Sequence, residues 1–64
     1  MKVEELIKVV DGFSDIRIFD SIDGDPILVG GLYQEDFRKS VKKYMDKEIR
    51  WFMASDVQCL DIVI

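Results

Sequence analysis

Asp15-Ile-Arg-Ile-Phe-Asp-Ser-Ile-Asp-Gly-Asp-Pro-Ile-Leu-Val-Gly-Gly-Leu32 is the stretch that indicates how the chain folds. Ile16 and Ile18 alternate with residues that point to the opposite face, and a period of two is typical of a strand. We therefore predict a strand over residues 15–21. Its apolar side faces a core.

The second half of this stretch predicts a turn and a second strand. Asp23-Gly24 is a strong hairpin-turn pair, because glycine adopts positive φ without a steric penalty. Pro26 cannot donate a ladder hydrogen bond, so we expect it at the start of the next strand, over residues 27–32. Gly30-Gly31 indicates a bulge or a close approach to the backbone there.

Two segments have helical periodicity: residues 3–10 before this hairpin and residues 34–45 after it. Their apolar residues recur three or four positions apart and form one face. Carboxylates open both segments, where the positive end of the helix dipole stabilises them, and Gly12 is expected to end the first helix. The apolar stripes are Val3, Leu6, Ile7 and Val10 in the first, and Phe37, Val41, Tyr44 and Met45 in the second.

Two more strands complete the chain. Residues 48–54 and 58–64 alternate with period two, and Ser55-Asp56 is expected to form the turn between them. The element order is then α-β-β-α-β-β. We predict one α+β domain over residues 1–64, with two helices on a single, mostly antiparallel four-stranded sheet.

The alternation of each strand also assigns residues to the two faces of the sheet. Beneath the helices we expect Ile16, Ile18, Trp51, Leu60 and Ile62, with Ile49 and Met53 on the same face. On the opposite face we expect Phe19, Phe52 and Val63, framed by the charged residues Arg17, Arg50 and Asp61. Apolar residues framed by charges resemble the core and rim of an interface, so Phe19, Phe52, Val63, Arg17 and Arg50 are the candidate interface residues. Two alternatives are open: a helix could cover each face and bury these residues, or they could be scattered surface residues without a role.

The residue types needed for common catalytic and ligand sites are missing. The chain has no histidine and a single cysteine, Cys59, so a disulfide within the chain, a zinc site and a base-activated thiol are not expected. Gly30-Gly31 matches neither phosphate-loop nor dinucleotide-binding patterns, and Asp20, Asp23 and Asp25 are not spaced as in a calcium-binding loop. We therefore expect no catalytic residues, no cofactor and no metal, and predict that the protein is not an enzyme.

The charge and hydropathy of the chain bear on its partners and location. The net charge is −4, which argues mildly against nucleic acid as a partner. The single basic cluster consists of Lys39, Lys42, Lys43, Lys47 and Arg50. No apolar run is long enough to cross a membrane, and the first residues lack the pattern of a signal peptide, so a cytoplasmic location is expected.

These observations favour a non-catalytic module that binds another protein, or itself as a homodimer. One alternative is an acidic inhibitor that occupies the nucleic-acid site of an enzyme, with Asp15, Asp20, Asp23 and Asp25 as one acidic stripe. A second alternative is a weak nucleic-acid binder that uses the lysine-bearing second helix.

The chain also resembles small proteins encoded in phages, prophages and mobile elements of Gram-positive bacteria. The resemblance lies in Val3-Glu4-Glu5-Leu6-Ile7, Ile16-Arg17-Ile18-Phe19, the Asp-Gly turn, and Leu60-Asp61-Ile62-Val63-Ile64. It implies an accessory protein, in some cases an inhibitor of a host defence system. The group has no defining motif, so the resemblance assigns no functional residue.

Overall fold

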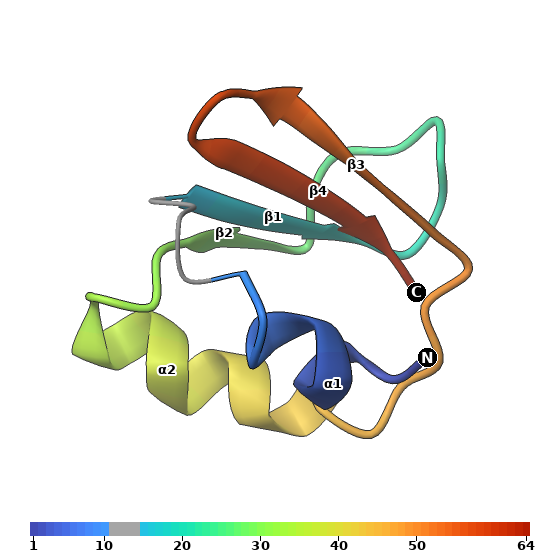
Figure 1. Cartoon of the computed structure of the whole chain (residues 1–64). Coiled ribbons are helices and arrows are strands. Elements are labelled where there is room, and N and C mark those ends of the chain that lie inside the picture. The colour runs from blue at the N-terminus through green and yellow to red at the C-terminus, as the bar shows by residue number, and fades with distance from the viewer. Residues whose placement is uncertain (11–14) are drawn as a thin grey trace.

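The computed structural model describes residues 1–10 and 15–64, and it has the predicted element order (Figure 1). The predicted helix end at Gly12 lies outside the described residues. A short 3₁₀ segment, η1, extends the second helix, and the third strand runs through the turn predicted at Ser55-Asp56. The elements are α1 (Val3–Ile7), β1 (Asp15–Phe19), β2 (Leu28–Gly30), α2 (Glu35–Val41), η1 (Lys42–Tyr44), β3 (Trp51–Asp56) and β4 (Cys59–Val63).

The four strands form one sheet in the order β2-β1-β4-β3, and it is mixed rather than mostly antiparallel as predicted. The two hairpin pairs are antiparallel, but the central pair, β1 and β4, is parallel, with Ile16 opposite Leu60 and Ile18 opposite Ile62. Parallel neighbours need a long crossover, and here β2, α2 and β3 supply it. This arrangement places the two strands with buried apolar residues side by side in the middle of the sheet.

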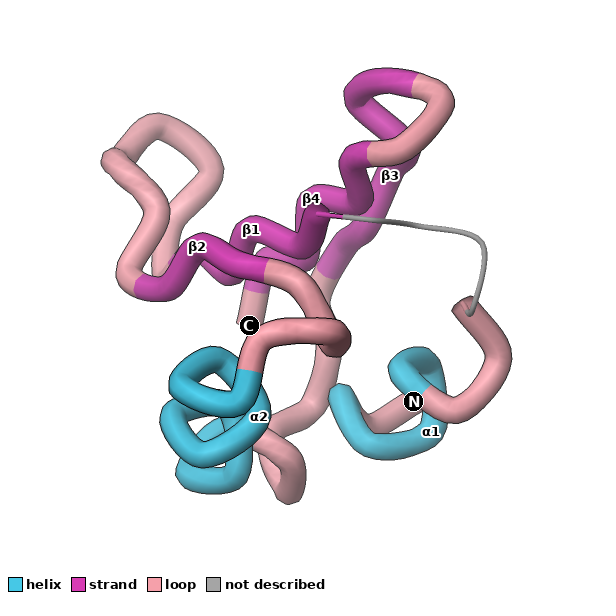
Figure 2. The backbone as a smooth tube through the Cα atoms, turned by 90° about the vertical axis from the view of Figure 1, so that its left-hand side faces the viewer, coloured by secondary structure: helices cyan, strands magenta, loops and turns pink. Residues whose placement is uncertain are grey.

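Both helices lie on the same face of the sheet (Figures 1 and 2). The buried cluster between the two layers contains residues of both helices and of β1 and β4. The expected positions of Ile16, Ile18, Leu60 and Ile62 beneath the helices are therefore confirmed. The cluster consists of Val3, Leu6, Val10, Ile16, Ile18, Phe37, Val41, Leu60 and Ile62.

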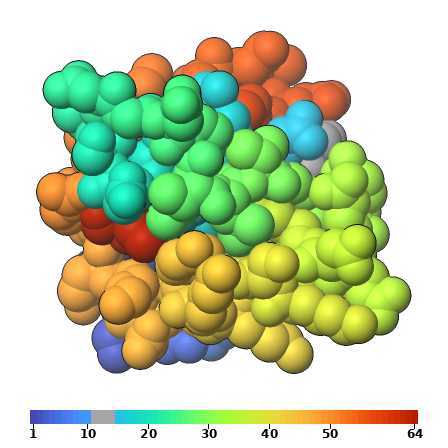
Figure 3. Space-filling model, turned by 180° about the vertical axis from the view of Figure 1, so that it is seen from behind, coloured from blue at the N-terminus to red at the C-terminus, as the bar shows by residue number. Residues whose placement is uncertain are grey.

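The connection between β1 and β2 is longer than the predicted tight hairpin. It spans residues 20–27, and none of the described residues has a positive φ, so Asp23-Gly24 does not form the turn type for which that pair is favoured. β2 is accordingly shortened to three residues, and Pro26 precedes it rather than starting it. Figure 3 shows this loop and β2 together with α2 on the face opposite to the view of Figure 1.

The close backbone approach predicted at Gly30-Gly31 is present. A Cβ atom placed on Gly30 would lie 2.6 Å from a ring carbon of Phe37, so α2 packs directly against the backbone of β2. The side chain of Gln34 holds the adjoining turn, because its Oε1 accepts a hydrogen bond from the N–H of Gly31 at 3.0 Å.

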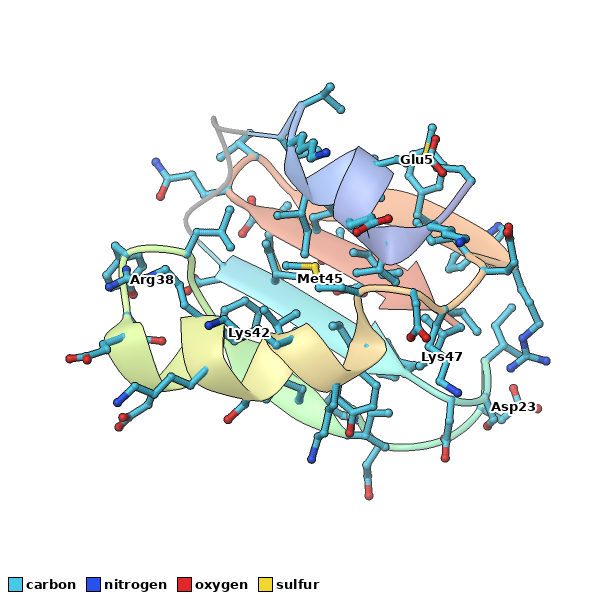
Figure 4. The ribbon with its side chains drawn as sticks, turned by 90° about the horizontal axis from the view of Figure 1, so that it is seen from below. Glu5, Asp23, Arg38, Lys42, Met45 and Lys47 are labelled. Atoms are coloured by element: carbon cyan, nitrogen blue, oxygen red, sulfur yellow. The ribbon has the colours of Figure 1, made fainter. Side chains whose placement is uncertain are left out.

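The start of the chain pairs with the segment that leads into β3. The N–H of Val3 donates to the carbonyl of Lys47 at 3.0 Å, and the N–H of Ile49 donates to the carbonyl of Met1 at 2.8 Å. Seen from the helix side, Met45 projects into the space between the two helices (Figure 4), and it packs against the buried cluster. These contacts fix the path of the chain into β3.

Candidate interaction face of the sheet

The chain bends at Arg50, and this bend decides which side of the sheet each β3 residue occupies. Ile49, before the bend, packs against the buried cluster as expected. After the bend, Trp51 lies opposite Val63 and Phe52 lies opposite Ile62. Directly opposite residues of paired strands share a face, so Phe52 lies on the helix side, and Trp51 lies on the side without helices.

The predicted faces of three β3 residues are therefore reversed. Trp51 and Met53 were expected beneath the helices, and Phe52 on the opposite side. The prediction assumes that side chains alternate between the two faces without a break along residues 48–54, whereas the bend at Arg50 interrupts this alternation. A shift of one residue moves every later side chain of the strand to the other face.

The side of the sheet without helices, which we call the open face, is lined with apolar residues. Trp51 and Met53 on β3 are 43% and 44% exposed, and Val29 on β2 is 57% exposed. The strand register places Val29 beside Arg17, Met53 beside Asp61, and Trp51 beside Val63. Across the two central strands, Arg17 lies beside Asp61 and Phe19 beside Val63. The open face consists of Phe19, Val29, Trp51, Met53 and Val63, with Arg17 and Asp61 at its centre.

Arg17 and Asp61 form a bidentate pair across the parallel strands β1 and β4. The Nε of Arg17 donates to one carboxylate oxygen of Asp61 at 2.8 Å, and its second nitrogen donates to the other at 2.7 Å. The hydrogen bonding of Arg17 to the Asp61 carboxylate is the main reason that the pKa of Arg17 is raised, so this side chain stays a cation. Asp61 also accepts from the hydroxyl of Ser55 at 3.3 Å and the thiol of Cys59 at 3.8 Å.

The paired charges and the aromatic residues pack together. The guanidinium carbon of Arg17 lies 5.5 Å from the centre of the Phe19 ring, within range of a cation–π interaction. Val63 lies between Phe19 on β1 and Trp51 on β3, and it is only 5% exposed although no helix covers this face. The open face is thus an ordered surface in which the central charges neutralise each other.

The pairing of Arg17 and Asp61 can be tested by comparing single and double variants. Asp61→Leu is expected to lower the midpoint of thermal unfolding, because it leaves the Arg17 cation without its partner beside apolar residues. Adding Arg17→Met should restore most of the loss. Thermal unfolding followed by circular dichroism measures both. A double variant no more stable than Asp61→Leu would show that the two side chains are not coupled.

Three of the five predicted interface residues, Phe19, Val63 and Arg17, meet on the open face, and the other two do not. Phe52 lies on the helix side yet is 48% exposed, on β3 at the edge of the sheet. Arg50 is tied within the chain: its Nε donates to the carbonyl of Ile64 at 2.7 Å, and another nitrogen donates to the carbonyl of Asp20. Both residues line a shallow hollow of about 270 Å³ near Met1.

Sequence reasoning missed Trp51, Met53 and Val29 as members of this face. Val29 could have been assigned from its position opposite Arg17, had the strand register been known. Trp51 and Met53 gave no such signal, because the bend that reverses them depends on the pairing of residues 45–49 with the start of the chain.

The charged residues behind the two alternative functions are dispersed. Asp15 begins β1, whereas Asp20 and the other loop carboxylates follow its opposite end, so they do not form one stripe. Of the predicted basic cluster, Lys42 and Lys47 lie at separate points along the helix layer (Figure 4). Lys39 is 3.4 Å from Glu35, and Lys43 lies over the ring of Tyr44, so these cations also have partners in the chain.

Within residues 1–10 and 15–64, no group of three or more potential metal ligands is present. An open groove of about 440 Å³ lies between β2 and the start of α2, with Glu35 and Asp36 at its rim. No helix among the described residues is long and apolar enough to cross a membrane.

Comparisons with protein-family models, curated proteins and solved structures found no match to this chain.

Proposed function

We propose that this protein is a non-catalytic interaction module that binds another protein through the open face. The observation that carries the proposal is the cluster of exposed apolar side chains around a neutralised charge pair, on a sheet face that no helix covers. Interfaces are enriched in aromatic residues, Met and Arg, and the open face contains Trp51, Phe19, Met53 and Arg17.

The partner surface should be apolar at its centre. Trp51 and Met53 supply apolar contact area. Arg17 and Asp61 are already paired with each other, so polar groups of the partner can contact this pair without first displacing another counter-ion. The phage-type resemblance fits such a role for an accessory protein, acting in the cytoplasm. An inhibitor of a host defence system would be one instance of it.

The proposal can be tested with substitutions on the open face that leave β3 unchanged. Phe19→Lys and Val29→Lys are expected to weaken binding by about tenfold or more, because each places a charge in an apolar contact. Ile22→Lys is the matched control, since Ile22 is 66% exposed but lies in the loop between β1 and β2.

Proteins retained by the wild-type chain and by Ile22→Lys would be purified and titrated against all four chains. Trp51 is the single tryptophan and lies on the open face, so its fluorescence reports binding directly. The proposal fails if the retained proteins bind all four chains equally, or if their binding leaves the emission of Trp51 unchanged.

A further inference from the structure

No strand among residues 1–10 and 15–64 pairs with the outer edge of β3, and this edge has few of the features that normally protect one. β3 is the last strand of the sheet, and all six of its residues are exposed. Edge strands are usually blunted by lysine, proline or an irregularity. β3 has neither lysine nor proline, and its β-bulge lies beyond Ala54, so residues 51–54 remain regular.

The register of the sheet shows which backbone groups face outward from this edge. The N–H of Ile64 donates to the carbonyl of Phe19, and the N–H of Asp15 donates to the carbonyl of Gln58. The backbone N–H and C=O groups of the even-numbered residues of β4 therefore point toward β1. The backbone groups of the odd-numbered residues, Asp61 and Val63, must then point toward β3. Their partners Met53 and Trp51 are bonded to β4, and alternation turns the N–H and C=O groups of Phe52 and Ala54 outward.

From this edge we infer that the protein forms a homodimer in which β3 pairs antiparallel with β3 of a second copy, about a two-fold axis at Met53. In this register Phe52 and Ala54 of one copy form hydrogen-bonded pairs with Ala54 and Phe52 of the other. Every outward amide and carbonyl of these residues is then used. Registers centred on Phe52 or on Ala54 leave some of them without a partner.

The side chains fit the same register. Phe52 faces the small Ala54 of the second copy on the helix side, so a large residue meets a small one at both ends of the regular segment. The contact is isologous, so it closes as a dimer and does not propagate.

This inference goes beyond the proposed function and does not depend on it, because the dimer uses backbone groups at the β3 edge, whereas the proposed function uses side chains of the open face. Pairing would extend the two four-stranded sheets into one continuous sheet. The Trp51 and Met53 side chains of both copies would then lie together on one side. Because a short strand edge buries less area than a standard interface, the dissociation constant is expected in the micromolar range or weaker.

Sedimentation equilibrium up to about 1 mM protein is the first test. The wild type should approach twice the 7.5 kDa mass of the chain. Ala54→Pro removes an outward N–H without touching the β4 ladder and should weaken the dimer by about tenfold or more. Val29→Pro is the matched control at the other edge of the sheet, where the dimer should be unaffected.

Three results would overturn the dimer: a monomer at every concentration, a dimer insensitive to Ala54→Pro, or equal loss with Val29→Pro. Circular dichroism shows whether each variant folds. If Ala54→Pro does not fold, Ala54→Lys replaces it, because an edge lysine opposes strand pairing while leaving the monomer backbone unaltered.

A cysteine pair tests the register. Two Met53 residues facing each other in a non-hydrogen-bonded pair have Cα atoms about 4.5 Å apart, within the range that a disulfide accepts. Met53→Cys in a Cys59→Ser background should therefore form a covalent dimer in a glutathione redox buffer. Trp51→Cys in the same background should not, because its Cα atoms would lie about 13 Å apart. Equal cross-linking of both variants, or none with Met53→Cys, would reject this register.

Discussion

Ile62→Ala is expected to reduce the free energy of unfolding by about 2–5 kcal/mol, the usual range for truncating a buried isoleucine. Ile62 is fully buried and lies on a central strand, opposite Ile18 on one side and Phe52 on the other. A domain of this size has a total stability of about 3–10 kcal/mol. The substitution should therefore leave the chain partly or wholly unfolded at physiological temperature.

Urea denaturation followed by circular dichroism measures the effect. Ile22→Ala is the matched control: the chemical change is identical, but Ile22 is 66% exposed and its truncation should change the free energy of unfolding by less than about 0.5 kcal/mol. Similar losses in both variants would mean that Ile62 does not lie in the core between sheet and helices.

Gly30→Ala is the second substitution with a large expected effect, a loss of about 1–3 kcal/mol by overpacking. The new methyl group would meet the Phe37 ring at 2.6 Å and the Phe37 Cβ at 2.9 Å. Phe37 is itself buried, so α2 would have to move away from β2. The φ angle of Gly30 is not positive, so the effect is steric and does not come from backbone conformation.

Gly24→Ala is the control for this substitution. Its new methyl group would meet only the hydroxyl oxygen of Ser21 at 3.1 Å, at the end of a side chain that can rotate. It should be neutral or stabilise by up to about 1 kcal/mol, because alanine restricts the unfolded chain. Combining Gly30→Ala with Phe37→Leu should recover part of the loss, and a double variant that shows simple additivity would contradict the proposed contact.

The sequence predicted the local elements well because local periodicity determines them. The alternation of Ile16 with Ile18, and of Leu60 with Ile62, correctly identified the buried face of the two central strands. The stripe with Phe37 and Val41 correctly identified the buried side of α2. The glycine pair at residues 30–31 also indicated the close approach, since only a residue without a side chain leaves room for Phe37.

The sequence could not predict how distant segments pair. Two hairpins are compatible with several strand orders, and the parallel contact of β1 with β4 is a long-range choice that buries two apolar strands together. The connection after β1 illustrates the same limit: Asp23-Gly24 is a strong turn pair by itself, yet the connection extends over residues 20–27.

The candidate site depended most on tertiary structure. By itself, the sequence determined that the domain is small and α+β, that it has no histidine and one cysteine, and that Phe19, Val63 and Arg17 share a face. The tertiary structure decided that both helices cover the other face, and that Trp51 and Met53, not Phe52, join the open one. The physical reason is the bend at Arg50: residues 45–49 pair with the start of the chain, and this long-range pairing resets the alternation of β3 by one residue.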